Sequence, residues 1–295
     1  MAARYDRGLD VSHRREMQHH RRQLAEARQI ISTMQSLAFI EVRRLRRVLE
    51  IQQQVVRGIF DIAADFLSFH AQLIPEPQPL QNLFLVIGSE RGFCGNFNEV
   101  LIQELERCLA AATGEHTGVV ACGRKLCERL TGHPRLLAPL DGAAVLDEVD
   151  GALSRLIARV TDLDVTSGSM ALTAIYCDPQ QENPQVRQLL PPFEVLRDAE
   201  RKFAFAPQLN LQPQQLLLEL ADQYLFAALH EILYVSLTAE NLRRMQHLEG
   251  AVRHLDNNLE TLQHRENQLR QEEIIEEIEV ILLSMNSASL APAGK

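Results

Sequence analysis

The sequence predicts an α fold with an added α/β domain: a long antiparallel coiled coil of N- and C-terminal helices, with a small doubly wound α/β domain between them. Three observations predict this architecture. Apolar residues recur at heptad spacing near the N-terminus and again in the C-terminal third, and the middle alternates strand-length apolar runs with amphipathic stretches. Two long helices at opposite ends of one chain bury their seams best against each other, and the returning chain makes the pair antiparallel.

The N-terminal helix carries two interleaved heptad sets. Only Glu41 and Gln52 interrupt them, which is typical of a coiled-coil seam rather than of an ordinary amphipathic helix. Pro75, Pro77 and Pro79 end the helix, because proline cannot continue it. The first set is Leu24, Ile31, Ala38, Leu45, Gln52, Ile59, Phe66 and Leu73, and the second is Ala27, Met34, Glu41, Val48, Val55, Ile62 and Phe69.

The C-terminal helix is expected to begin at Pro213, since proline suits a first helical position. Its seam consists of Met245, Leu248, Val252, Leu255, Leu259, Leu262, Glu266 and Leu269. Beyond Leu269 the apolar residues change phase, so this tip is expected to leave its partner helix and meet another surface. The apolar residues of the tip are Ile274, Ile275, Ile278, Ile281, Leu282 and Met285.

The middle of the chain contains apolar runs of strand length separated by helical patterns. The expected strands are 83–87, 119–122, 170–177 and 186–190, and the expected helices are 99–112, 125–130 and 145–160. The chain therefore divides into a flexible N-terminal arm (1–20), an N-terminal coiled-coil helix (21–74), an α/β domain (80–196), a connector (197–212), a C-terminal coiled-coil helix (213–287) and a tail (288–295).

Composition excludes several classes of function. A net charge of −9 gives no general attraction to nucleic acid. No apolar run approaches the roughly 18–20 residues that a membrane-spanning helix needs. The five cysteines are scattered, with no CxxC pair, which indicates a reduced, cytosolic protein.

A glycine-bearing loop, 88–98, follows the first expected strand, where phosphate-binding loops commonly lie. It lacks the GxxxxGK[ST] spacing, and its glycines fit no dinucleotide motif, so nucleotide binding is disfavoured. Cys94 has no histidine near it in the motif, which favours a packed, inert thiol over a nucleophile. The sequence therefore predicts no catalytic residue, no metal and no cofactor bound by this chain.

Five groups of residues, in order along the chain, resemble the motifs of one family. They are Ile30–Met34 (IISTM), Glu90–Asn98 (ERGFCGNFN), Gln188–Pro191 (QLLP), Phe203–Pro207 (FAFAP), and a last-helix series of Glu240, Arg244, Met245, Arg270, Gln271, Ile274, Glu277 and Ile278. The family is the gamma subunit, the central rotor shaft, of F-type ATP synthases. Four positions depart from its pattern and indicate a divergent or alternative-ATPase branch: Glu90 for Asp, Asn96 for Gly, Ala206 for Glu and Ile275 for Thr.

The resemblance implies a coiled coil inside a ring of alpha and beta subunits, with ATP or ADP and Mg²⁺ on those partners. It implies a foot domain on the epsilon subunit and the membrane c-ring, and a chain that is itself non-catalytic. The complex would lie on the cytoplasmic face of the bacterial inner membrane, with this chain peripheral and not spanning.

The resemblance also implies four sets of site residues. They are the beta-subunit contacts Arg270, Gln271 and Glu277; the apolar bearing tip Ile278, Ile281, Leu282 and Met285; the foot-domain signature loop Glu90, Arg91, Gly92, Cys94, Gly95 and Asn98; and the ring and epsilon side Phe203, Phe205 and Pro207. Two rival classes stay open at this point. A coiled-coil scaffold or adaptor would explain the helices but not the loop, and a nucleotide-handling enzyme would explain the α/β domain but lacks a phosphate loop.

Overall fold

The computed structural model describes residues 2–74, 81–112, 117–163, 170–197 and 203–289, with side chains at all of these except 2–14, 81, 170 and 283–289. The elements, in chain order, are α1 (Ala2–His70), η1 (Ala71–Leu73), β1 (Gln81–Ile87), α2 (Phe97–Ala111), β2 (Thr117–Cys122), α3 (Arg124–Leu130), β3 (Leu136–Leu140), η2 (Leu146–Glu148), α4 (Val149–Asp162), β4 (Met170–Tyr176), β5 (Gln185–Leu190), η4 (Glu194–Leu196) and α5 (Pro213–Ser289).

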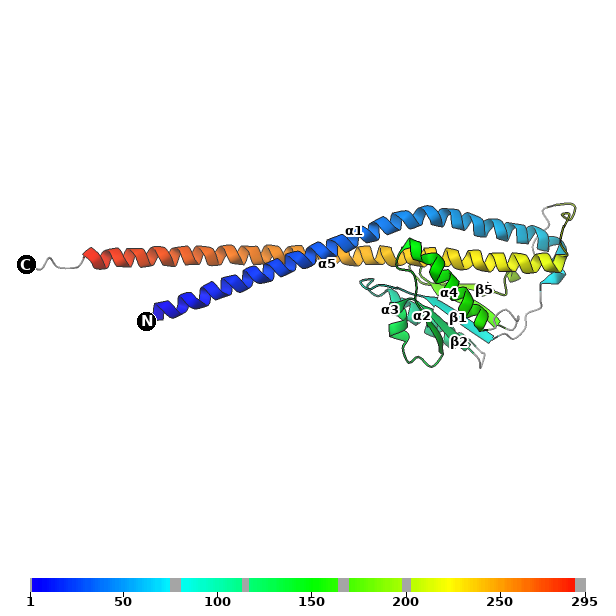
Figure 1. Ribbon diagram of the computed structural model, residues 1–295, viewed down its shortest axis with the longest axis horizontal. Coiled ribbons are helices and arrows are strands. Elements are labelled where there is room, and N and C mark those ends of the chain that lie inside the picture. Colours follow the sequence, from blue (N-terminus) through cyan, green and yellow to red (C-terminus); the bar gives the residue numbers. More distant parts are fainter. Residues whose placement is uncertain (1, 75–80, 113–116, 164–169, 198–202, 290–295) are drawn as a thin grey trace, which may run out of the picture. The chain divides into compact units, whose positions relative to one another are not determined.

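The chain forms two compact units, and the long helices α1 and α5 each contribute to both of them (Figure 1). The coiled-coil unit consists of Met1–Gln35 and Leu248–Lys295. The α/β unit consists of Ser36–His247, and so includes the second half of α1 and the first part of α5.

The helices of the coiled-coil unit are antiparallel. Arg28 Nε lies 2.7 Å from Asp256 Oδ1, while Gln18, ten residues earlier in α1, donates to Glu266 of α5 at 2.8 Å. The residue numbers of α5 therefore increase as those of the contacting residues in α1 decrease, so the two helices run in opposite directions. The predicted antiparallel pair is confirmed.

The predicted α5 seam is also confirmed by burial. Leu248 is fully buried, and the later seam positions are half-buried, as expected where only one partner helix covers them. Beyond this seam Ile278 is 51% exposed and Leu282 is 56% exposed. The apolar residues of the tip therefore face solvent, as does nearly every other described side chain after Leu269.

In the α/β unit, the second predicted heptad set of α1 is wrong by one residue. Val56 is 6% exposed and Ala63 is fully buried, whereas the predicted seam residues Val55 and Ile62 are 46% and 57% exposed. Val42 is likewise buried instead of Glu41. The helix faces both α5 and the α/β core here, so its buried stripe follows the wider packing surface instead of the predicted phase.

The sheet has the strand order β3-β2-β1-β4-β5. Strands β1 to β4 pair in parallel, and β5 pairs antiparallel with β4 at one edge. The predicted doubly wound α/β domain is confirmed as a mixed, mostly parallel sheet.

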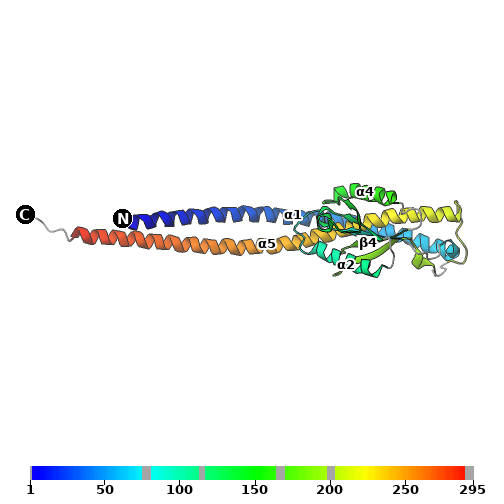
Figure 2. The ribbon, with the colours of Figure 1, turned by 90° about the horizontal axis from the view of Figure 1, so that it is seen from below.

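Both faces of the sheet are covered, as Figure 2 shows with α4 and α2 on opposite sides. On one face, Leu83, Leu85 and Leu172 pack in a core with α4 and with the α1 and α5 segments of this unit. On the other face, Phe84 and Val86 pack against α2 and α3. Alternate residues of β1 thus enter different cores, which explains its continuous apolar sequence.

One strand of the sheet lies outside the sequence-based prediction. The edge strand β3 was not expected, because it is short and holds Pro139, and proline is tolerated at a sheet edge but weakens a strand pattern. The stretch 1–20, expected to extend the first helix as a flexible arm, is helical from Ala2 onward as part of α1. Within the described residues, no helix is both long enough and apolar enough to cross a membrane.

Candidate functional site

The loop that follows β1, residues 88–98, begins with a close approach of two backbone segments. A Cβ on Gly88 would lie 2.5 Å from Cβ of Leu126 in α3, so the loop and the helix approach at a distance that excludes a side chain. Gly123 has φ +116, and a Cβ there would lie 2.5 Å from the carbonyl oxygen of Gly88. The loop therefore needs glycine at both positions.

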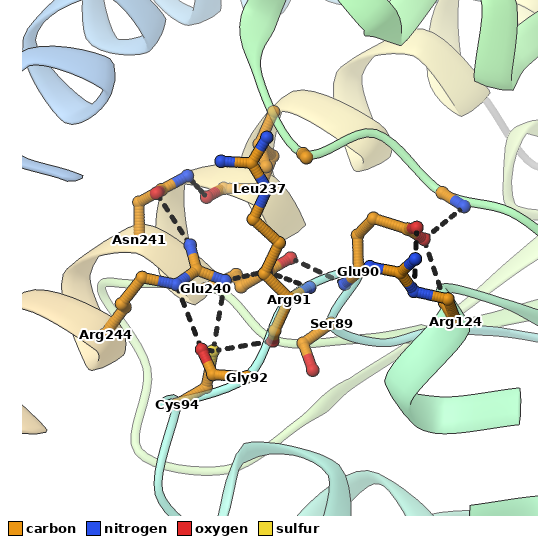
Figure 3. Close-up of polar contacts among 12 residues, drawn as sticks. Ser89, Glu90, Arg91, Gly92, Cys94, Arg124, Leu237, Glu240, Asn241 and Arg244 are labelled. Atoms are coloured by element: carbon orange, nitrogen blue, oxygen red, sulfur yellow. Dashed lines mark hydrogen bonds and ion pairs between the residues drawn. The ribbon is translucent and has the colours of Figure 1, made fainter. Parts of the chain in front are cut away.

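Glu240 of α5 binds this loop through its backbone. The carboxylate accepts hydrogen bonds from the N–H of Glu90 at 3.3 Å and from the N–H of Arg91 at 3.2 Å (Figure 3). One turn later in α5, Arg244 donates to the same carboxylate and forms an ion pair with it. Their side chains are 3% and 6% exposed, so the pair is buried.

Arg244 also binds the loop directly. Its Nε donates to the carbonyl oxygen of Gly92 at 3.2 Å, and its Nη2 donates to Sγ of Cys94 at 3.3 Å. A third contact, from Nη1 to Oδ1 of Asn241 at 2.8 Å, fixes the guanidinium plane (Figure 3). We call Glu240 and Arg244, with the loop groups that they bind, the loop clamp.

Burial sets the electrostatics of the loop clamp. Desolvation raises the pKa of Glu240, while Arg244 and the two loop N–H groups oppose that rise. Burial, with a smaller contribution from Glu240, raises the pKa of Cys94 to about 12. The Cys94 thiol is therefore protonated at neutral pH, as expected of a packed thiol and not of a nucleophile.

Glu90 joins three strand ends. Its Oε2 accepts from the N–H of Arg124 at 2.9 Å and from the N–H of Gly142 at 2.8 Å, and its Oε1 lies 3.7 Å from Nε of Arg124. Those partners follow β2 and β3, whereas Glu90 follows β1. Its role in this chain is to hold the loops together at the carboxyl edge of the sheet.

The other residues of the signature loop have distinct positions. Asn98 is buried, accepts from the N–H of Ser89 at 3.0 Å and donates to its hydroxyl at 2.8 Å. Gly95 has φ +61, a conformation that glycine adopts most readily. The Arg91 side chain is exposed, and Phe93 is 54% exposed. The loop is thus held by its backbone groups and by the side chains of Glu90 and Asn98, and it presents Arg91 and Phe93 to solvent.

The remaining predicted site residues lie outside the loop clamp. Arg270, Gln271 and Glu277 are exposed on α5 in the coiled-coil unit. In the tip, Ile278, Ile281 and Leu282 are 51–56% exposed, and the side chain of Met285 lies outside the described residues. Phe203 and Phe205 are 58% and 87% exposed in the α/β unit, and Pro207 is also exposed. Two of the four sets thus belong to each unit.

Sequence reasoning placed Glu240 and Arg244 in a family motif but assigned them no contact. One signal was present: two charged residues stand four apart at the end of a mostly apolar stretch of α5 that begins at Leu225 and includes His230 and Glu231. Such residues pair with each other or with a buried partner. No group of three or more metal-ligating side chains occurs among the residues that the structure describes.

The fold and the site together define a class of protein with two long antiparallel helices and a doubly wound domain, in which a loop of the domain is hydrogen-bonded to a buried ion pair of the last helix. A family model described as ATP synthase matches residues 13–287. The chain therefore belongs to the ATP synthase gamma chain family.

Similar proteins agree with this membership. An ATP synthase gamma chain of Syntrophus aciditrophicus is 30% identical over 200 residues, covering 65% of this chain and 68% of the relative. One from Clostridium perfringens is 22% identical over 271 residues, covering 88% of this chain and 92% of the relative.

Solved structures share the fold. The rotor of the Euglena gracilis mitochondrial ATP synthase in rotational state 1 matches with a TM-score of 0.60 at 14% identity, covering 90% of this chain and 99% of that one. A chain of the OSCP/F1/c-ring structure of the same enzyme in rotational state 3 also has a TM-score of 0.60, at 16% identity, covering 97% and 98%.

Proposed function

We propose that this chain couples ion-driven rotation of a membrane c-ring to ATP synthesis or hydrolysis on beta subunits, and that it contributes no catalytic side chain itself. The observation that carries the proposal is the exposed surface of α5 at its C-terminal end, with Arg270 and Gln271 followed by an apolar tip. ATP or ADP and Mg²⁺ would bind to the partner subunits.

The two parts of this surface suit two kinds of contact. Arg270 and Gln271 can form directional hydrogen bonds with one beta subunit at a time, and so distinguish the beta conformations. The side chains of Ile278, Ile281 and Leu282 offer apolar area without donors or acceptors, so a surrounding sleeve could turn past them without breaking hydrogen bonds. Coupling requires a contact free energy that differs between open and closed beta states.

The α/β unit would form the foot of the rotor. Phe203, Phe205 and Pro207 are exposed on it, and we assign them to the epsilon subunit and the c-ring. Exposed aromatic side chains of this kind are enriched at protein interfaces. The complex would then lie peripherally on the cytoplasmic face of the bacterial inner membrane.

A double substitution tests the proposal. Arg270→Ala with Gln271→Ala should lower the rate of coupled ATP synthesis by about tenfold or more, because one or two charge-assisted hydrogen bonds to a beta subunit are lost. The complex should still assemble. Arg265→Ala with Gln268→Ala is the matched control, since it removes the same side-chain types from exposed positions of the same helix.

The measurements are ATP synthesis in membrane vesicles and recovery of alpha and beta subunits with the tagged chain. Unchanged synthesis in a normally assembled complex would remove the role of Arg270 and Gln271. Failure of the wild-type chain to recover alpha and beta subunits would favour a coiled-coil adaptor instead.

A further inference from the structure

The α/β unit has a topological switch point between β1 and β4. The chain leaves β1 through α2 on one face of the sheet and enters β4 through α4 on the other face, while the two strands are neighbours. In doubly wound proteins, the crevice at the carboxyl ends of two such strands is where ligands bind, and the loop after the first strand binds anions there.

Here α5 occupies that crevice. Ser236 donates to the carbonyl oxygen of Ile87, the last residue of β1, at 3.2 Å. The loop after β1 contacts α5 at Glu240 and Arg244. On the β4 side, the loop 177–183, the start of α2 and α5 line a cavity of about 300 Å³. The helix therefore runs between the two loops that would otherwise enclose a ligand.

We infer that Glu240 is a built-in anionic ligand: its carboxylate fills an anion site formed by the N–H groups of Glu90 and Arg91 and the guanidinium of Arg244. The two N–H groups are consecutive in the chain and converge on the two oxygens of one carboxylate. Arg244 is 5% exposed, so the site supplies a buried positive charge as well. The ligand class is a small carboxylate, and this conclusion does not depend on the rotor function.

If Glu240 is shortened to alanine, the emptied anion site should bind a small carboxylate from solution. Glu240→Ala removes a CH₂–COO⁻ group, which has the heavy atoms of acetate, and leaves two donors and a buried cation without an anion. Acetate in solution should then bind to the folded chain and stabilise it by mass action. In the wild-type chain the site is already filled, so acetate should have no specific effect.

The first experiment measures thermal unfolding of the full-length chain in sodium acetate against sodium chloride at equal ionic strength. Glu240→Ala should unfold at a lower temperature than wild type in chloride and regain about 3 °C or more in 0.1–0.5 M acetate. Glu231→Ala is the matched control, because Glu231 also pairs with an arginine, Arg187, but this arginine lies on β5 and not beside the loop after β1. Equal acetate effects on wild type, Glu240→Ala and Glu231→Ala would overturn the inference.

A second variant covers the case in which Glu240→Ala does not fold. Glu240→Gln keeps the shape of the side chain but removes the charge, so the N–H groups of Glu90 and Arg91 should exchange with deuterium about tenfold faster or more. The N–H of Ser89 bonds to Asn98 instead, and its exchange should stay unchanged. Equal acceleration at Ser89, or none at Glu90 and Arg91, would contradict the assigned role of the carboxylate.

Discussion

The sulfur of Cys94 lies 3.3 Å from Nη2 of Arg244, which donates to it. The pKa of this thiol is about 12 because burial raises it and the charge of Glu240 adds to the rise, while Arg244 lowers it. Burial also raises the pKa of Cys177 to about 12, without Glu240 as a cause. The two thiols therefore respond differently to a change at Glu240.

We predict that Glu240→Gln speeds alkylation of Cys94 at pH 8. Removal of the negative charge leaves Arg244 uncompensated beside the sulfur, so the pKa of Cys94 falls and more thiolate forms at a given pH. Residue-resolved mass spectrometry after timed alkylation would measure the rate. Cys177 is the internal control, and equal acceleration at both residues would indicate general unfolding instead.

Arg244→Ala should lower the free energy of unfolding by roughly 3–5 kcal/mol, because it leaves the Glu240 carboxylate buried without its cation. Arg253→Ala is the matched control. Arg253 pairs with Glu249 at the same spacing in the same helix, but the side chains are 75% and 45% exposed, and the expected loss is below about 0.5 kcal/mol. Urea unfolding of both variants checks the difference, and similar losses would contradict a buried clamp.

The corrected seam of α1 can be tested with two adjacent valines. Val56→Ala should lower the free energy of unfolding by about 1.5–3 kcal/mol, since it removes two buried methyl groups and leaves a cavity. Val55→Ala, at a position 46% exposed, should change it by less than about 0.5 kcal/mol. A larger loss of unfolding free energy for Val55→Ala than for Val56→Ala, measured by denaturant unfolding, would support the heptad phase expected from the sequence instead.

Two glycines should respond to alanine with opposite signs. Gly123→Ala adds a Cβ at φ +116 and 2.5 Å from the carbonyl oxygen of Gly88, so it should destabilise the α/β unit by about 2 kcal/mol or more. Gly58→Ala lies inside α1 with nothing within 4 Å of the added Cβ, and should stabilise the chain by about 0.5–1 kcal/mol. Thermal unfolding of each variant gives the sign directly.

The periodicity of apolar residues predicted the long helices and most strands. It could not determine which face of α1 is buried or which strand forms the edge of the sheet. Val55 and Val56 are chemically identical, and only the tertiary surface that α1 meets determines which one is buried. Strand β3 escaped prediction because it is only five residues long and holds Pro139, which weakens a strand pattern.

The contacts of the loop clamp could not be predicted from the sequence for a different reason. The loop and Glu240 are about 150 residues apart in the chain, and the spacing of two charged residues in a helix does not name their third partner. The sequence placed Glu90 in a signature loop, but its bonds to the N–H groups of Arg124 and Gly142 depend on the order of the strands, which local patterns do not contain.

The paired burial of Glu240 and Arg244 has a consequence for the history of this chain. Substitution of either residue alone would leave an unpaired charge in the interior. Related proteins should therefore keep both residues or replace both, even where the rest of the sequence differs. Glu240 contacts Arg91 only through its main-chain N–H, so the exposed side chain at position 91 can vary, whereas Glu90 is constrained by its bonds to the N–H groups of Arg124 and Gly142. The exposed side chains of the loop can thus change during evolution while the hydrogen bonds between the loop and α5 are conserved.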